Sequence, residues 1–478
     1  MDWRGIGIAV TLQMLSVAYD SPAPAAEADE TTRRLDRPQY ESLRFDEDWS
    51  GLKDNNHSAS GDAWDRLKLI PLGPDDGAWL TFGGQLRERE EYFRNFLLGA
   101  PSTADTDAYL LSRARLSADL HVSPYLRVFA EEKSAFALNR DLQGGSTSSY
   151  VQEWALQNGF ADVSFAMGGE ANVTLRAGRQ EMLYGSQRLV GEPDFGQTRR
   201  TYDGGRGIVQ IRDWSISLFG TQPAVPQAYE LNTSSSERRL FGVFASGPLD
   251  RVNLDLYWLG VDNADANFNS TSGRERRHTL GGRASGRIDE TGMDFELEGA
   301  AQFGSVGSED VAAWMLTGVL GYTATAMKSS PRIYVELDYA SGDDSPGGRV
   351  GTFNQLYPAS HSFLGYIDYI GRENIISQSS GLSMTPRPNL TLSVQQYFFW
   401  RASASDALYS KSGTVIRDGT GTTARYVGAE IDVLANYNFT RHLLGYAGYS
   451  HFFAGDFIAK TGASEDSDFV YLALQYTF

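Results

Sequence analysis

Hydrophobic and polar residues alternate with a period of two along most of the chain from Ala78 onward. In residues 110–122, for example, Leu, Ala and Val positions alternate with Arg113, Arg115 and Asp119. Alternation of this kind is typical of β-strands with one apolar and one polar face. Roughly 18 such segments can be traced, and long helical patterns are hard to find. The pattern therefore predicts an all-β protein.

Short turns and long loops separate these segments. Short connections such as residues 247–250 carry Gly, Pro and Asp, which suit tight turns. The long connections are rich in Gly, Ser, Asn and Asp and are expected at residues 139–149, 262–273, 342–374 and 404–424. Strands of about 10 residues with turns and loops in this order indicate a transmembrane antiparallel β-barrel of about 18 strands. Closure of the barrel leaves no backbone group unpaired in lipid.

The last eleven residues support a membrane barrel. Val470, Leu472, Leu474 and Phe478 share one face of a strand, and the final residue is aromatic. Outer-membrane barrels present such a terminal strand to their assembly machinery. We therefore expect the barrel assembly machinery to recognise Phe478, and we expect outer-membrane lipid and lipopolysaccharide to surround the barrel.

The N-terminus has the features of an export signal. Residues 1–28 contain Arg4, a short apolar stretch over 6–18, and small residues at Ala23-Pro24-Ala25 or Ala26-Glu27-Ala28. A disordered tail is the alternative. Polar, irregular residues 29–77 are expected to form a periplasmic extension, and residues 78–478 the barrel. This organisation predicts the outer membrane of a Gram-negative bacterium.

Composition narrows the class of protein. The chain has 478 residues, no cysteine, and a formal charge of −18 from 42 Lys and Arg against 60 Asp and Glu. The lack of cysteine excludes thiolate metal sites, thiol catalysis and disulfides, and the acidic balance argues against a nucleic-acid partner. Only six of the 42 basic residues are Lys, which leaves 36 Arg. Arginine is a permanent charge whose planar fork suits carboxylates.

A soluble sandwich or propeller is the rival interpretation of the strands. The chain shows no repeat of about 40–50 residues that would mark propeller blades. The polar faces of the strands are also too charged for the interior of a sandwich, where two apolar sheets must pack together. Both observations favour the membrane barrel.

Four stretches resemble the alginate export family of outer-membrane porins. They are Arg44-Phe-Asp-Glu-Asp-Trp-Ser with Leu67–Leu72 and Leu80–Arg89; Leu175–Gln180 with Tyr184-Gly185 and Arg188–Val190; Arg200–Arg206; and Phe353–His361 with Gly365, Asp368 and Asn374. The resemblance implies an 18-strand barrel with a positively charged lumen. The member that gives the family its name exports alginate, a polyuronate, whereas many relatives have no established substrate.

Strand alternation also selects candidate residues for the pathway. The arginines expected to line the lumen are Arg87, Arg89, Arg113, Arg115, Arg127, Arg176, Arg179 and Arg401, although strict alternation points Arg179 outward. The long connection 342–374 is a candidate constriction loop, with Asp343, Asp344, Tyr357 and His361. The alternative for each arginine is a structural ladder with acidic residues on adjacent strands.

The sequence indicates no enzyme, metal site or cofactor. It contains no G-x-S-x-G elbow, P-loop or H-E-x-x-H motif, and the six histidines show no ligand spacing. Fixed guanidinium groups can replace the water and counterions that an anion loses in a narrow pore. We therefore predict an anion-selective channel for an alginate-like polysaccharide or for anionic solutes. The alternatives are a porin for small nutrients or hydrophobic compounds, and an outer-membrane enzyme or adhesion protein with a plugged barrel.

Overall fold

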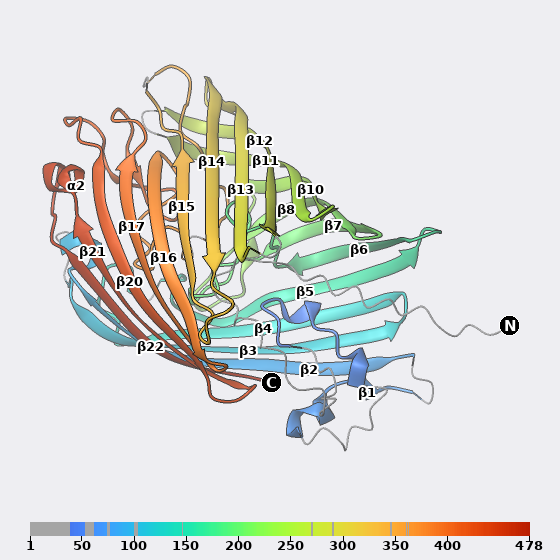
Figure 1. Ribbon diagram of the computed structural model, residues 1–478. Coiled ribbons are helices and arrows are strands. Elements are labelled where there is room, and N and C mark those ends of the chain that lie inside the picture. Colours follow the sequence, from blue (N-terminus) through green and yellow to red (C-terminus); the bar gives the residue numbers. More distant parts are fainter. Residues whose placement is uncertain are drawn as a thin grey trace.

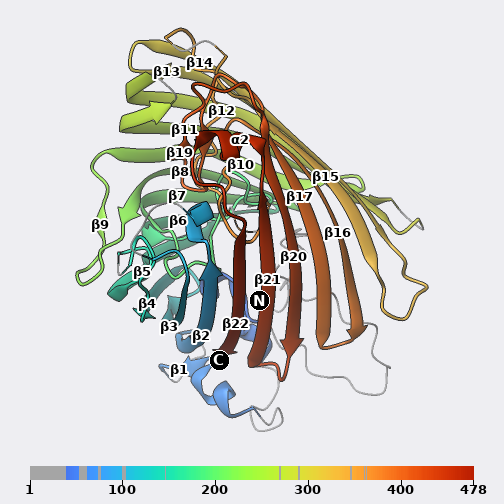
Figure 2. The ribbon, with the colours of Figure 1, turned by 90° about the vertical axis from the view of Figure 1, so that its left-hand side faces the viewer.

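Eighteen long strands, each hydrogen-bonded to the next, close into one antiparallel barrel (Figure 1, Figure 2). The structure is a computed structural model that describes residues 39–52, 62–73, 77–99, 104–145, 147–268, 271–288, 291–344, 347–359, 361 and 363–478. The first and last long strands pair with each other, from Gln85 opposite Thr477 to Arg94 opposite Asp468. This pairing closes the sheet, as the alternation in the sequence predicts. The expected export signal lies outside the described residues.

The long strands have the following bounds: β2 Trp79–Arg94, β3 Asp107–Ser123, β4 Leu126–Leu138, β5 Gln152–Ala166, β6 Ala171–Gln180, β7 Tyr202–Ile211, β8 Trp214–Val225, β10 Arg238–Leu249, β11 Val252–Phe268, β12 Thr271–Ile288, β13 Met293–Val306, β14 Glu309–Thr323, β15 Arg332–Ala340, β16 Ile375–Arg387, β17 Leu390–Arg401, β20 Tyr426–Asn438, β21 Leu443–Ala454 and β22 Ser467–Thr477. Short strands are β1 Ile70–Pro71, β9 Thr233–Ser234, β18 Leu408–Tyr409 and β19 Val415–Arg417. Helical turns are η1 Arg44–Asp46, η2 Ser50–Leu52, η4 Ala63–Leu67, α1 Phe96–Gly99 and α2 Asp456–Thr461. No helix of the described residues is long and apolar enough to cross a membrane.

The two faces of the barrel wall have inverted polarity relative to a water-soluble protein. Outward side chains such as Leu116 and Leu472 are 56% and 59% exposed, whereas the inward Arg87 and Arg113 are each 1% exposed. Burying arginine while exposing leucine is unfavourable in water, but it suits a wall with lipid on its outer face. The period of two in the sequence is the local cause, because it places all the apolar positions of a strand on one side.

The two ends of the barrel differ. Short turns, such as the one between β10 and β11, lie at the end that holds the C-terminus, and β1 with the helical turns before it lies at this end too (Figure 1). The longest connections lie at the opposite end. Residues 262–273, expected to be a loop, instead extend the β11–β12 hairpin. The ion pair of 2.6 Å between Asp262 and Arg274 joins the two strands there.

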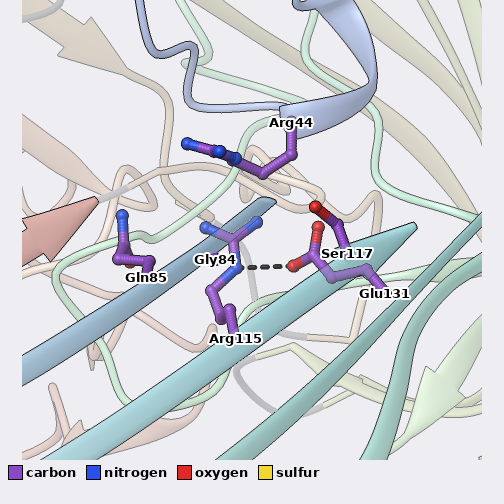
Figure 3. Close-up of a pocket in the computed structure, with 6 residues that line it drawn as sticks. All are labelled: Arg44, Gly84, Gln85, Arg115, Ser117 and Glu131. Carbon is purple, nitrogen blue, oxygen red and sulfur yellow. Dashed lines mark hydrogen bonds and ion pairs between the residues drawn. The ribbon is translucent and has the colours of Figure 1, made fainter. Parts of the chain in front are cut away.

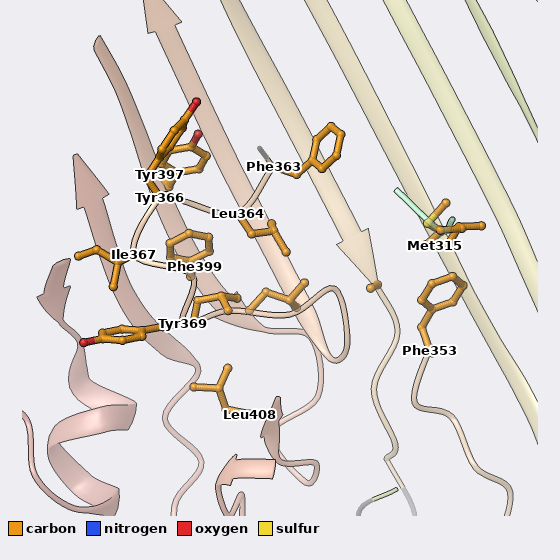
Figure 4. Packing of buried hydrophobic residues seen from close by; sticks show 14 of the residues in the cluster. Met315, Phe353, Phe363, Leu364, Tyr366, Ile367, Tyr369, Tyr397, Phe399 and Leu408 are labelled. Atoms are coloured by element: carbon orange, nitrogen blue, oxygen red, sulfur yellow. The ribbon is translucent and has the colours of Figure 1, made fainter. Parts of the chain in front are cut away.

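Long connections fold back into the barrel and pack against its wall. Residues 341–374, between β15 and β16, contribute Phe363, Leu364 and Ile367 to a buried cluster with Tyr397 and Phe399 of β17 (Figure 4). Residues 181–201, between β6 and β7, also enter the interior and contribute the buried side chains of Met182, Leu189 and Val190 to the same cluster. Both segments therefore contribute to a core that lies inside the barrel.

The lipid-facing wall yields a prediction for stability. Leu316 lies at the middle of β14 and is 48% exposed on the outer face. We expect Leu316→Arg to lower the free energy of unfolding in phospholipid vesicles by about 2–4 kcal/mol, because a charge is placed near the bilayer midplane. Denaturant titration followed by tryptophan fluorescence measures the change, and Leu316→Met serves as the control. Equal stability of the two variants would contradict a lipid-facing Leu316.

Candidate channel lining and constriction

The inner face of β2 to β6 carries a set of buried arginines. Arg87, Arg89, Arg113, Arg115 and Arg176 are each at most 6% exposed. Arg87 and Arg113 occupy directly opposite positions in the register of β2 and β3. Like charges in opposite positions repel, so this pair needs a negative or strongly accepting partner between its members.

Residues 181–201 supply that partner. The Asp194 carbonyl oxygen accepts hydrogen bonds from Arg87 at 2.7 Å and from Arg113 at 2.9 Å. The Asp194 carboxylate pairs with Arg113 at 2.9 Å and also with Arg199. Arg89 donates to the Phe195 carbonyl and lies 3.8 Å above the centre of the Phe195 ring. The wall arginines thus hold this segment inside the barrel, and the segment in turn satisfies the arginines.

The charges around Asp194 fix its ionisation state. Burial alone would raise the pKa of the Asp194 carboxyl, but the positive charges of Arg113, Arg199 and Arg87 outweigh burial and hold the pKa well below its usual range. Asp194 therefore carries a negative charge at any physiological pH. A permanent anion lies between cations that face it from both the wall and its own segment.

The opposite wall is acidic. Buried charged side chains of the described strands β2 to β6 comprise six cations (Arg87, Arg89, Arg113, Arg115, Lys133, Arg176) and four acids (Glu91, Asp119, Glu131, Asp162). Those of β11 to β20 comprise eight acids (Asp255, Glu275, Glu296, Glu298, Glu336, Asp338, Glu430, Asp432) and three arginines (Arg277, Arg283, Arg401). The lumen therefore has one basic wall and one acidic wall, whereas the family resemblance implies a positively charged lumen.

Arginines from the inserted segments bridge to the acidic wall. Arg188 pairs with Glu336 at 2.9 Å, with Glu298 at 3.2 Å and with Glu296. Arg372, near the end of residues 341–374, pairs with Asp338 at 3.1 Å. Residues 181–201 consequently bind both walls, with Asp194 on the basic side and Arg188 on the acidic side. This double attachment holds the segment across the interior, between the two walls.

Two of the residues expected in the constriction loop meet this segment. The Tyr357 amide donates to the Leu189 carbonyl at 2.8 Å, and burial raises the pKa of Tyr357 to about 12. The His361 ring stacks on Phe195 with centroids 3.7 Å apart, and its Nδ1 lies 3.0 Å from the Asp368 carboxylate. Residues 341–374 and 181–201 therefore form one joint constriction.

The other two residues of the expected loop lie elsewhere. The Asp343 amide donates to the Asp406 carboxylate at 2.8 Å, and the Asp343 carbonyl accepts from Ser403 at 2.9 Å. Asp343 thus joins residues 341–374 to the 402–425 connection, and Asp344 is exposed. The structure does not bring either aspartate to Tyr357 or His361.

Two further arginines of the predicted pathway have distinct environments. Arg127 pairs with Asp119 at 2.7 Å, as a step in a ladder across adjacent strands. Arg401 donates to the carbonyls of Asp406 and Ala424 and holds the 402–425 connection in place. Arg401 thus lies on the inner face of β17, and its guanidinium is engaged by this connection.

Arg179 lies on the face of β6 opposite Arg176. It pairs with Asp203 at 2.8 Å and donates to the Asn232 carbonyl at 3.1 Å, on the outer side of the sheet. β6 and β7 pair without a bulge around Arg179, so nothing turns the residue inward. Its inclusion among the lumen arginines is corrected, and the reason is the strict alternation that the sequence itself displays.

The sequence-based reasoning missed the residues that build the constriction. Arg188, Asp194, Phe195 and Arg199 all lie in residues 181–201. Parts of this stretch stood out in the sequence only through their resemblance to the family. A usable signal was present, because the stretch has no alternation and contains Pro193 and three glycines over a length that exceeds ordinary connections. Its inward course could not be foreseen from that signal alone.

Comparisons with known proteins agree with this architecture. The family model described as alginate export matches residues 78–471. No curated protein matches the chain. Among solved structures, OccK8 (OprE) of Pseudomonas aeruginosa has a TM-score of 0.54 at 12% identity, over 84% of this chain and 98% of that one.

Two further solved structures have the same barrel. Pseudomonas aeruginosa OccK2 (OpdF), in complex with glucuronate, has a TM-score of 0.53 at 13% identity over 84% of this chain and 96% of that one. Acinetobacter baumannii OccAB1 has a TM-score of 0.54 at 11% identity over 87% of this chain and 99% of that one. At these identities the likeness establishes the fold alone.

The Asp194 contacts predict an effect on conduction. Asp194→Asn keeps the carbonyl contacts but removes the charge between Arg113 and Arg199, so residues 181–201 should leave their position more often. We expect open-channel current noise in planar bilayers to rise by roughly twofold or more. Asp203→Asn, which removes the partner of the outward Arg179, is the matched control. Identical noise in the two variants would show that the Asp194 charge does not hold the segment.

Burial of Glu373 predicts a pH dependence of stability. Its carboxylate accepts from the Gln355 amide at 3.2 Å, and burial raises the pKa of Glu373 to about 8 from its ordinary 4.5. The folded state therefore retains a proton between these values, and stability falls as pH rises through this window. Glu373→Gln should flatten the decline of the thermal midpoint between pH 4.5 and pH 8, whereas Glu465→Gln at an exposed position should not. An unchanged decline in Glu373→Gln would count against this assignment.

Proposed function

The chain belongs to the alginate export family, and from this premise we propose that it is a passive channel of the Gram-negative outer membrane that conducts carboxylated sugars, as polymer or as short units. The fold is that of outer-membrane porins. Such channels act by selective diffusion, and the proposal includes no catalytic step, metal or cofactor.

The basic wall of β2 to β6, together with Arg206 of β7, carries the proposal. Arg127, Arg176 and Arg206 occupy one cross-strand row, in which Arg176 lies opposite both Asp162 and Arg206. The Arg127 side chain is 18% exposed and Arg206 is half-buried, whereas Arg176 is buried, so part of the row is open to solvent. Guanidinium groups in such a row can form paired hydrogen bonds with successive carboxylates. The neighbouring acids weaken each site, and weak multiple sites are what conduction requires.

The nature of the solved relatives supports a uronate as the permeant species. OccK2 (OpdF) was solved in complex with glucuronate, a carboxylated sugar of the same chemical class as the units of alginate. The basic wall of this chain offers the charge that a carboxylate needs, and the acidic wall opposite repels anions toward it. Both features favour an anionic sugar over a neutral or hydrophobic solute.

A channel for small anionic solutes is the second candidate. The joint constriction of residues 181–201 and 341–374 favours it, because Phe195, His361 and Arg89 pack closely together there. A polymer would require the constriction to widen, whereas a single sugar acid would require less movement. Conductance in the presence of glucuronate and of uronate oligomers would distinguish the two candidates.

Neutralising two arginines of the cross-strand row should change ion selectivity. We expect the double variant Arg127→Gln/Arg176→Gln to lower the anion-to-cation permeability ratio by about threefold or more, because two fixed positive charges leave the pathway. Reversal potentials in a KCl gradient across planar bilayers measure this ratio.

The matched control removes two arginines from outside the lumen. Arg212 and Arg274 are 77% and 54% exposed, and Arg212→Gln/Arg274→Gln should leave the reversal potential unchanged. Cation selectivity of the unaltered protein, or equal selectivity in both double variants, would overturn the proposed anion pathway.

A further inference from the structure

Residues 39–52 enter the interior of the barrel from the end where the C-terminus lies. Phe45 is 3% exposed, and its ring meets the rings of Phe129 and Phe160 edge-on with centroids 5.6 Å and 5.1 Å away. Phe129 and Phe160 belong to the inner faces of β4 and β5. The side chain of Phe45 is therefore lodged between wall residues inside the barrel.

Arginines of the wall and of residues 181–201 hold the main chain of this segment. Arg127 donates to the Phe45 carbonyl at 2.6 Å, and Arg199 donates to the Ser42 carbonyl at 3.2 Å. The Arg176 guanidinium lies 4.6 Å from the centre of the Phe45 ring. Two arginines of the proposed anion pathway thus have direct contacts with Phe45.

Arg44 closes the remaining gap at the wall. It donates to the Phe478 carbonyl at 2.8 Å and lies above Arg115, Glu131 and Gln85 (Figure 3). The space between these side chains is too narrow for a water molecule. The segment therefore fits closely against the seam between the first and last strands.

Asp46 follows Phe45 directly in the chain, so the segment also carries a carboxyl next to the residue that contacts Arg127 and Arg176. Desolvation raises the pKa of this carboxyl, and the positive charges of Arg176, Arg206 and Arg127 act in the opposite direction. Arg127, Arg176 and Arg206 form the cross-strand row described above. The segment thus offers the row a carboxylate, carbonyl oxygens and a flat apolar ring, which are the groups that a carboxylated sugar chain would offer.

We propose that residues 39–52 are an internal pseudo-ligand: they occupy an anion subsite at Arg127 and Arg176, and an incoming carboxylated sugar opens the channel by displacing them. The inference rests on the proposed function, because it assigns the same arginines to the permeant anion. The segment lies outside the residues 78–471 that match the family model. Displacement requires only that the sugar bind the open state more tightly than the closed one.

Conductance of variants in the segment tests the proposal. In the full chain, Phe45→Ala removes the aromatic anchor and Asp46→Asn removes the carboxylate, and neither alters an arginine of the wall. We expect Phe45→Ala to raise the mean conductance in planar bilayers about fivefold or more, with a smaller rise for Asp46→Asn. Phe45→Ala should keep the reversal potential of the unaltered protein, because it removes no charge.

Asp48→Asn is the matched control. Asp48 is exposed in the same segment, and its carboxylate accepts only a local hydrogen bond, from the Ser50 amide at 2.9 Å, among the contacts that the structure describes. Its conductance should equal that of the unaltered protein. A rise in Asp48→Asn equal to that in Asp46→Asn would show that the wall arginines do not sense Asp46, and would overturn the pseudo-ligand.

A second measurement follows displacement directly. The chain has no cysteine, so Leu43→Cys, at a position that is 7% exposed, provides a single reporter thiol. A membrane-impermeant maleimide should label it slowly. Sodium glucuronate should accelerate labelling severalfold, whereas glucose at the same concentration should not.

The outcomes separate this inference from the proposed function. Unchanged conductance of Phe45→Ala would overturn the inference, and anion selectivity that depends on Arg127 and Arg176 would leave the proposed function standing. Higher conductance of Phe45→Ala in a channel without anion selectivity would show that residues 39–52 obstruct the pore. It would overturn both the anion pathway and the pseudo-ligand. Labelling that ignores glucuronate would overturn displacement by a carboxylated sugar.

Discussion

Charges that face the interior of this barrel must be neutralised by the chain itself, and the contact of Asp194 with Arg87 and Arg113 shows how. The two arginines come from adjacent strands and oppose each other directly. An uncompensated buried charge costs several kcal/mol, and losing one partner of a buried pair typically costs about 3–5 kcal/mol. Placing a backbone carbonyl and a carboxylate between the arginines removes this cost. The position of residues 181–201, and with it the constriction, depends on this contact.

The same physical requirement explains why several segments fill the interior. Residues 39–52 present carbonyl oxygens to Arg127 and Arg199, and Arg188 and Arg372 reach the acidic wall. Each contact stabilises the closed arrangement and simultaneously occupies a group that a permeant ion would use. Such a channel must therefore keep its buried charged groups paired and still leave some of them available to the permeant ion. Bonds from arginine to backbone carbonyls suit that balance, because a ligand can replace them without leaving an unpaired acid behind.

The opposite charge on the two walls makes the lumen electrostatically asymmetric across its width. The excess of buried cations lies on β2 to β6, and the excess of buried acids lies on β11 to β20. The formal charge of −18 conceals this arrangement, because it sums residues that face the lumen, lipid and water. The excess of Arg over Lys is more informative, since the planar fork of Arg can satisfy two acceptors at once, as Arg176 does with both oxygens of Asp162.

The sequence by itself determined the elements that depend on neighbouring residues. Period-two alternation specified the strands, the inward course of Arg87 and Arg113, and the outward course of Arg179 that the pathway assignment disregarded. Only the tertiary structure decided which charges meet. Asp194 lies 107 residues beyond Arg87, and the direction in which residues 181–201 leave β6 is not encoded in a local period. Likewise, Asp262 and Arg274 extended a hairpin where composition indicated a loop. Strand faces follow from backbone geometry, whereas inserted segments follow from long-range pairing of charges, which no window of sequence contains.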